Sequence, residues 1–152
     1  CKRLQELCDY PLLRQLNIFR CNKLSELCEY PLLTKLTLRA CTWRINLIEY
    51  PLLTSLKILD CNNIHKLVNY PLLTQLILHG TSGITTLLDY TLLTDLRLIR
   101  CENIHELKKY PCLMVLRLIR DNIHELIEYP RLKYLVVRIC AHLDDATFDY
   151  RT

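Results

Sequence analysis

Glycine is scarce in this chain, with only two among 152 residues. Glycine adopts left-handed backbone conformations without strain and is the usual residue of sharp turns. The turns here must therefore be made by other residues, in the same way each time. Long apolar runs are also missing: no stretch approaches the roughly 18 residues that span a bilayer, and the N-terminus has no signal-peptide pattern. We predict no contact with a membrane.

Chemical motifs are missing as well. The chain has nine cysteines but no Cys-x-x-Cys pair, a spacing typical of zinc sites. It has no glycine-rich phosphate loop, and no serine or cysteine nucleophile recurs beside a histidine. The formal net charge of +4 is too mild to indicate nucleic acid by itself. We predict that the chain is not an enzyme and holds no cofactor or metal ion.

What the chain does have is one repeated unit, Tyr-Pro-x-Leu-x-x-Leu-x-Leu-x-x-Cys-x-x-Ile-x-x-Leu-x-x. Its tyrosines are twenty residues apart until a last interval of nineteen: Tyr10, Tyr30, Tyr50, Tyr70, Tyr90, Tyr110 and Tyr129. With 51% apolar residues, the chain is predicted to be folded and not disordered. A strict period of this length is typical of a solenoid, in which each coil is stable only when its neighbours seal it.

The spacing within a unit selects the structure of the coil. Leu56 and Ile58 are two residues apart, so in a strand they point to one side while Lys57 points to the other. Twenty residues leave too little room for a strand and an average helix, and proline disfavours helix at the residue before it. We predict one short strand per unit and an extended, polyproline-like or 3₁₀ return segment, with little or no regular α-helix.

These marks resemble those of a known family. The string Leu53-x-x-Leu56-x-Ile58-x-x-Cys61-x-x-Ile64 is similar to the leucine-rich repeat, with cysteine where asparagine is more usual. The short period resembles the compact repeats of bacterial effectors and of some large-virus and amoebal proteins. The resemblance covers essentially the whole chain. It implies an α/β-type solenoid with a curved parallel sheet on its concave side, and protein binding there, without indicating a partner.

The repeats predict a single domain over residues 1–152, with about seven repeats. We expect a partial repeat at 1–9 and a polar C-terminal cap at 141–152. Because the chain begins at Cys1, in the middle of a coil and without a polar cap, we expect it to be a fragment of a longer protein. An uncapped N-terminal edge would also allow an end-to-end dimer by strand addition.

Three units depart from the pattern. Arg44 takes the place of the isoleucine, so we expect Trp43 or Ile45 to turn inward instead. Thr81 replaces a cysteine, and the sixth unit lacks one residue at 120–122. That loss should pinch one turn without breaking the stack.

Six cysteines share one phase of the repeat: Cys1, Cys21, Cys41, Cys61, Cys101 and Cys140. Stacked strands lie about 4.8 Å apart, so we expect these thiols to form an interior column as small buried hydrophobes. Disulfides between adjacent coils are within reach, but a column has no natural pairing, and a metal site needs converging ligands. Cys8 and Cys28 are expected in or near the core. We predict a reduced cysteine ladder and an intracellular protein, cytoplasmic or delivered into a host cytoplasm.

The repeated histidines, the tyrosine column and a leucine column are interpreted as structural features. His105 and His124 come from successive coils, near Glu106 and Glu125, but their phase belongs to the return path, where polar residues are solvated. We expect the tyrosine rings to shield the core edge and leave their hydroxyls in water. A partly exposed leucine column is a second-choice contact surface: Leu12, Leu32, Leu52, Leu72 and Leu92.

The strand residues that point away from the core carry the recognition signal. They vary sharply, while their inward neighbours stay leucine or isoleucine. Basic residues dominate them against Asp60 and Asp95, whereas acids gather on the return path, which predicts a basic concave face and an acidic back. Arginine and tyrosine beside exposed aliphatics are typical of a protein-binding hot spot. The predicted partner-binding residues are Lys57, Arg97, Ile99, Val115, Arg117, Ile119, Tyr134 and Arg138.

We therefore predict a non-catalytic protein–protein interaction module for an acidic, partly apolar partner. One alternative is the substrate-recognition part of a larger enzyme such as a ubiquitin ligase. A second is nucleic-acid binding, which is disfavoured because Phe19 and Tyr134 are too few for a stacking platform. A third is an ordinary sheet surface with scattered apolar residues.

Overall fold

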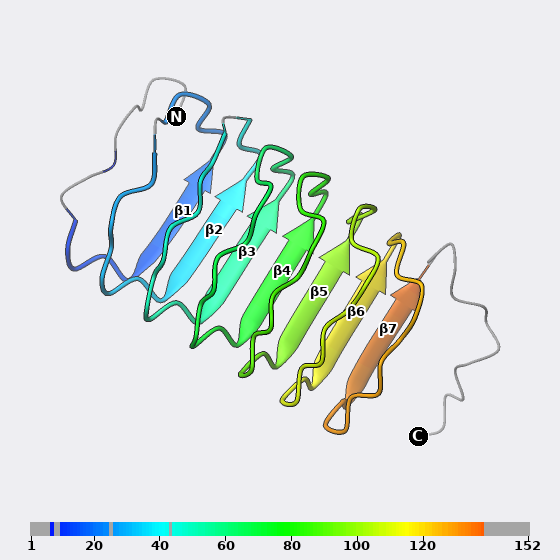
Figure 1. Ribbon diagram of the computed structural model, residues 1–152. Helices are drawn as coiled ribbons and strands as arrows, with labels where there is room; N and C mark the ends of the chain where they lie inside the picture. Colours follow the sequence, from blue (N-terminus) through cyan, green and yellow to red (C-terminus); the bar gives the residue numbers. More distant parts are fainter. Residues whose placement is uncertain (1–6, 8–9, 25, 43, 139–152) are drawn as a thin grey trace.

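The computed structural model describes residues 7, 10–24, 26–42 and 44–138, and these form one repetitive β structure (Figure 1). The strands are β1 (Gln15–Phe19), β2 (Lys35–Arg39), β3 (Ser55–Leu59), β4 (Gln75–His79), β5 (Asp95–Ile99), β6 (Val115–Ile119) and β7 (Tyr134–Arg138). Each strand lies where the repeat spacing predicts it. No helix occurs in the described ranges, and the return segments are extended with turns. The expected cap at 141–152, and the partial repeat at 1–9 apart from Leu7, lie outside the described residues.

All seven strands belong to one parallel sheet in sequence order, β1 to β7. Neighbouring strands pair with a shift of twenty residues, as in Leu36↔Leu56. The last pair shifts by nineteen, as in Val115↔Tyr134. The residue missing at 120–122 is therefore absorbed by the return segment, and the stack continues as predicted.

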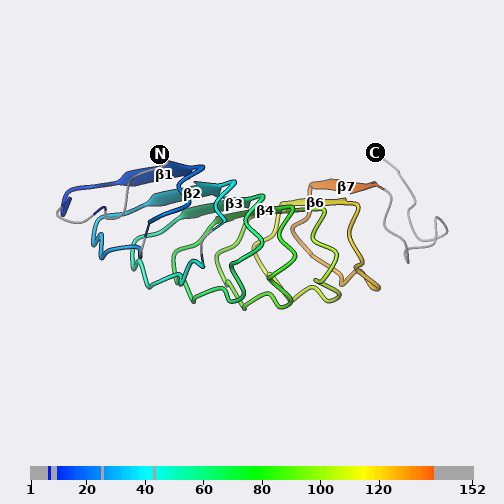
Figure 2. The same cartoon turned by 90° about the horizontal axis from the view of Figure 1, so that it is seen from above.

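The molecule has two layers, the strands on one side and the return segments on the other (Figure 1). Seen from above, the row of strands bows, and β1 and β7 rise on the side away from the return segments (Figure 2). The strand face is therefore the concave one. This arrangement confirms the predicted fold: a solenoid with a curved parallel sheet and no regular helix in the part described.

The core lies between the two layers. The second and fourth residues of β2 to β6 are buried, and the isoleucine and leucine marks of the return segments pack beneath them. Ile45 is 3% exposed while Arg44 is exposed, which confirms Ile45 as the inward residue of its unit. Trp43 lies outside the described residues.

The turns confirm that glycine is not required. The residue after each of β1 to β6 has a left-handed backbone, with φ between 50° and 58°: Arg20, Ala40, Asp60, Gly80, Arg100 and Arg120. A residue with a side chain adopts this conformation at a cost of about 1 kcal/mol. The packing of the neighbouring coils offsets that cost.

The hydroxyls of the buried tyrosines are hydrogen-bonded to the main chain and not left in water, which corrects the prediction. Tyr50, Tyr70 and Tyr90 are at most 2% exposed. Each donates a hydrogen bond to a main-chain carbonyl of the preceding coil: Tyr50 to Cys28 at 3.1 Å, Tyr70 to Ile48 at 3.1 Å, and Tyr90 to Val68 at 2.8 Å. The reason is that extended return segments leave carbonyls without main-chain partners, and buried carbonyls need donors. The same burial raises the pKa of each of these phenols.

The cysteine column is polar as well as apolar. Cys21, Cys41, Cys61 and Cys101 are buried thiols, not disulfides. Cys61 Sγ accepts a hydrogen bond from Cys41 N at 3.4 Å and donates one to Leu59 O at 3.3 Å. The thiol therefore forms hydrogen bonds with main-chain groups at the bend that follows the strand. Cys28 lies near the core as expected. It is disulfide-bonded, and it is not one of the six cysteines predicted to form the reduced ladder.

Two polar residues share the cysteine phase. Thr81 is fully buried, and its Oγ1 lies 3.4 Å from Cys101 Sγ. Asp121 is 1% exposed and accepts hydrogen bonds from Cys101 N at 2.7 Å and Ile119 N at 2.8 Å. The sequence did not predict a buried carboxylate here, because the missing residue of the sixth unit obscured the phase.

Candidate interaction surface

The concave face is built from the first, third and fifth residues of each strand. Seven of the eight predicted partner-binding residues gather there on three adjacent strands: Arg97 and Ile99 on β5, Val115, Arg117 and Ile119 on β6, and Tyr134 and Arg138 on β7. The register places Arg97 beside Arg117 and Ile99 beside Ile119. We call these seven residues the C-terminal patch.

The eighth predicted residue, Lys57, lies on β3 and is separated from the patch by β4. It lines a polar hollow over β1 to β4 together with Gln15, Lys35, Thr37, Ser55 and Gln75. The concave face thus has a polar N-terminal half and an arginine-rich, aliphatic C-terminal half. The sequence analysis did not predict the polar hollow.

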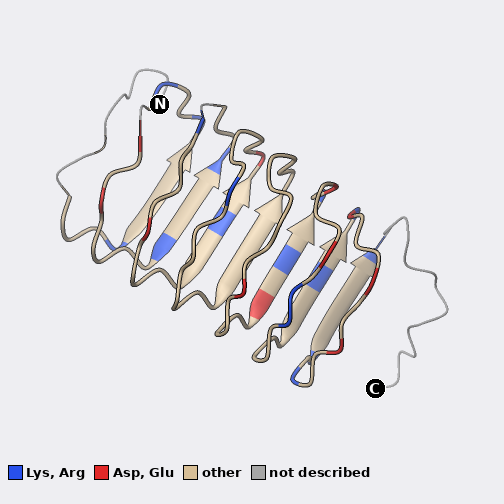
Figure 3. Ribbon diagram, in the orientation of Figure 1, with Lys and Arg blue, Asp and Glu red and all other residues tan. Residues whose placement is uncertain are grey.

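The charge of the concave face is basic, as predicted. Six basic residues lie on the seven strands against a single acid, Asp95: Lys35, Arg39, Lys57, Arg97, Arg117 and Arg138. Figure 3 shows these blue segments on the strands and both colours on the return segments. The back is therefore mixed and not acidic, because basic residues offset its acids: Lys23, Arg44, Lys66, Lys108 and Lys109.

Arg97 is compensated by its own strand. Its Nε and Nη2 donate hydrogen bonds of 2.9 Å to Asp95 Oδ1 and Oδ2. Gln75 Nε2 also donates to Asp95 Oδ2, at 2.9 Å, and Ser55 Oγ donates to Gln75 Oε1. The hydrogen bonds to Asp95 raise the pKa of Arg97. This row links the two halves of the face and fixes the Arg97 guanidinium.

Arg117 is arranged differently. Its Nε is buried, and no hydrogen-bond acceptor lies within reach of it among the described residues. Its guanidinium carbon lies 6.0 Å from the centre of the Tyr134 ring, at the outer limit of a cation–π contact. Val115 occupies on β6 the place that Asp95 occupies on β5. Arg117 therefore lacks the acid that its neighbour has.

A second aromatic cluster, at the N-terminal end, was missed by the sequence analysis. The guanidinium carbons of Arg20 and Arg39 lie 5.0 Å and 5.5 Å from the centre of the Phe19 ring. The pairing of Phe19 with Arg39 follows from the register. The approach of Arg20 depends on its left-handed turn, for which the sequence gives no signal.

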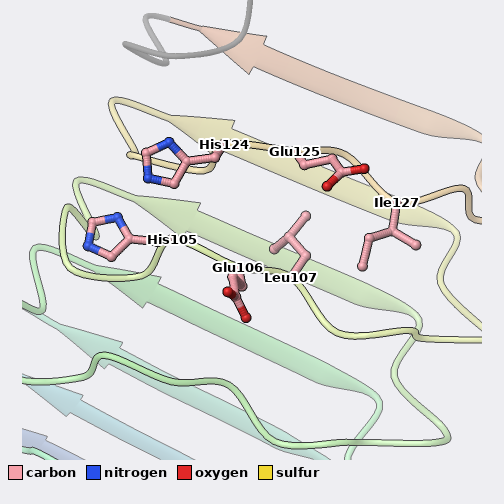
Figure 4. A pocket seen from close by; sticks show the side chains of 6 residues that line it. All are labelled: His105, Glu106, Leu107, His124, Glu125 and Ile127. Carbon is pink, nitrogen blue, oxygen red and sulfur yellow. The ribbon is translucent and has the colours of Figure 1, made fainter.

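The histidines lie side by side, as the repeat suggests. The rings of His105 and His124 are stacked, with centroids 5.3 Å apart, and His105 Nδ1 lies 3.3 Å from Asn122 O. Figure 4 shows them on successive return segments, with the carboxylates of Glu106 and Glu125 pointing away from the rings. Within the described ranges, no three potential ligands converge on a metal position.

The leucine column is partly exposed, as predicted. Leu12 is 78% exposed, and Leu52, Leu72 and Leu92 are each about two fifths exposed. They follow the tyrosines at the turn that leads into each strand. None of the residues described belongs to a helix with the length and apolarity of a bilayer span.

No protein-family model, curated protein sequence or solved structure matches this chain.

Proposed function

We propose that this chain is a leucine-rich-repeat module that binds another protein through its concave face and catalyses no reaction. The observation that carries the proposal is the C-terminal patch. It joins three arginines and a tyrosine to half-buried aliphatic residues on three paired strands. Arginine and aromatic residues are enriched at the energetic centres of protein interfaces.

The family assignment is supported by the bend after each strand. In the leucine-rich repeat, asparagine satisfies main-chain groups at this position. Here Cys61 accepts a hydrogen bond from the main chain of the preceding coil and donates one to its own strand. A thiol is a weaker donor and acceptor than an amide, but it also fills apolar space in the core.

The charge of the face indicates the chemistry of the partner. Six basic residues against one acid favour an acidic partner surface. Ile99, Ile119 and Val136 lie among the arginines and stay partly exposed, which favours a partner that also offers apolar groups. Nucleic acid fits this half less well, because Arg97 is already neutralised by Asp95.

An intracellular location belongs to the same proposal and rests on Cys61 and Cys101, which are thiols within the core. The disulfide at Cys28 is instead typical of a protein from an oxidising compartment. Binding at the concave face does not depend on which compartment holds the protein.

A peptide-library selection tests the proposed function. Random peptides displayed on phage are selected on the wild-type protein, and the affinity of the enriched peptides is then measured for the wild type and for two double variants. We expect the enriched peptides to combine acidic with aliphatic or aromatic residues. Their affinity for Arg97→Glu/Arg117→Glu should be at least about 100-fold lower than for the wild type. The control, Lys66→Glu/Lys108→Glu, makes the same change of charge on the return segments and should bind normally.

Two results would contradict the proposal. One is equal binding by the concave variant and the return-segment variant. The other is preferential binding of single-stranded nucleic acid, with affinity that falls steeply as salt rises.

A further inference from the structure

We propose that Arg117 is the binding subsite for a single carboxylate, which a partner protein presents beside an aliphatic or aromatic side chain. This inference rests on the proposed function and names the chemistry of its central contact. It is carried by the difference between two arginines that the sheet places next to each other.

The first observation is the unmet donor. Buried donors in folded proteins nearly always have an acceptor. Arg117 Nε is buried, and no acceptor lies within reach among the described residues. A guanidinium offers its Nε–H and an Nη–H as a parallel pair of donors, and a carboxylate has the matching pair of oxygens. Asp95 already engages Arg97 in this way, on the adjacent strand.

The second observation is why Arg117 lacks such an acid. Arg97 is neutralised by Asp95, two residues earlier on the same strand. The equivalent residue of β6 is Val115. The two strands are otherwise closely alike, Asp-Leu-Arg-Leu-Ile and Val-Leu-Arg-Leu-Ile. One difference, aspartate against valine, leaves one cation compensated and the other ready for an acid from outside.

The third observation concerns the kind of anion. The Tyr134 ring lies beside the Arg117 guanidinium. Val136 is paired with Arg117 in the register, and the paired Ile119 and Ile99 lie two residues further along β6 and β5. Apolar neighbours strengthen one charge-assisted contact but solvate a second negative charge poorly. A single carboxylate with an apolar neighbour therefore fits better than a phosphate.

The test of the subsite is an NMR titration that observes the arginine side chains directly. Hexanoate serves as the probe, because it is a carboxylate with an aliphatic tail. Acetate, hexylammonium and inorganic phosphate serve as comparisons. Each is titrated into the ¹⁵N-labelled protein, and the Nε–Hε resonances of the arginines are recorded by NMR.

We expect hexanoate to shift the Arg117 resonance along a saturable curve, with the Arg97 resonance moving much less. Acetate should bind about tenfold more weakly, because it lacks the apolar contact. Hexylammonium should leave the Arg117 resonance in place. Val115→Asp gives Arg117 the acid that Arg97 has, so this variant should lose the response to hexanoate while keeping the arginine.

Three results would overturn the inference: equal shifts of Arg117 and the exposed Arg44, saturation of Arg117 by phosphate at lower concentration than by hexanoate, or an unchanged response in Val115→Asp. The backbone spectrum of each variant reports whether it is folded. Peptide binding that still depends on the concave face, without a hexanoate response at Arg117, would refute the subsite and leave the proposed function standing.

Discussion

The phenolic oxygen of Tyr70 lies 3.1 Å from the carbonyl oxygen of Ile48, in the preceding coil, and donates a hydrogen bond to it. Tyr50, Tyr90 and Tyr110 make the same bond with their own preceding coils. The tyrosine that marks the repeat therefore fastens each coil to the one before it. It acts through its hydroxyl as well as through its ring.

The first prediction concerns this hydroxyl. Tyr70→Phe keeps the ring but leaves the Ile48 carbonyl without its donor, which should lower the free energy of unfolding by about 1–2 kcal/mol. The matched control is Tyr10→Phe at the exposed end of the column, where the ring is 55% exposed and the effect should be within about 0.5 kcal/mol. Urea unfolding measures both. Equal effects of the two substitutions would show that the hydroxyl contributes nothing.

The second prediction reverses the usual expectation for glycine. Gly80 has φ of 58°, yet five other coils hold non-glycine residues in this conformation. A Cβ there would lie 2.7 Å from Oδ1 of Asp60, at the end of a side chain that is about half exposed and can turn aside. Gly80→Ala should therefore change stability by less than about 1 kcal/mol.

Gly83 is the matched case without a left-handed backbone. An added Cβ would lie inside van der Waals contact of the Asn62 and Ile64 carbonyl oxygens, which are backbone atoms of the preceding coil and not the ends of flexible side chains. Gly83→Ala should destabilise by about 1–3 kcal/mol. Thermal unfolding of both variants decides the matter, and a larger loss in Gly80→Ala would contradict the packing described.

The third prediction concerns the buried Asp121. Burial raises the pKa of its carboxyl above the ordinary 3.8, the charge of Glu102 adds to this, and the hydrogen bonds from Cys101 N and Ile119 N oppose it. The folded state then holds this proton more tightly than the unfolded state. Stability is therefore lost as the pH rises from 3.8 through the folded-state pKa.

Asp121→Cys isolates this effect, because it restores the residue found at the same phase in other coils and its thiol stays protonated over this range. The variant should gain stability relative to the wild type as the pH rises from 3.8 through the folded-state pKa of Asp121. Denaturant unfolding at several pH values measures the difference. A difference that stays constant, or that moves in favour of the wild type, would contradict the assigned direction.

Much of the fold could be predicted from the sequence because the repeat is strict. Leu56 and Ile58 mark an inward-facing pair of strand positions, and repetition of that pair every twenty residues fixes both the strands and their register. The shortened sixth unit was predicted to stay in the stack, and Val115 does pair with Tyr134. Patterns of this kind follow from the geometry of a strand alone.

Hydrogen bonds were harder to predict, since they depend on where main-chain groups lack partners. Nothing in the motif tells that Tyr70 reaches the carbonyl of Ile48 or that Asp121 accepts from two main-chain amides. The concave face was predicted residue by residue, yet its internal pairing was not. Asp95 was counted only toward the charge balance of the face, and only the structure shows that it neutralises Arg97 and not Arg117.

The most direct test of the central claim is to locate a bound peptide on the molecule. Isoleucine methyl groups are suitable reporters, because Ile77, Ile99 and Ile119 lie on the concave face while Ile48 and Ile127 lie on the return segments. Methyl NMR spectra are recorded with and without a selected acidic, apolar peptide. We predict shifts at Ile99 and Ile119, with Ile48 and Ile127 unchanged. Shifts at Ile48 and Ile127, with Ile99 and Ile119 unmoved, would place the partner on the opposite layer and contradict the account.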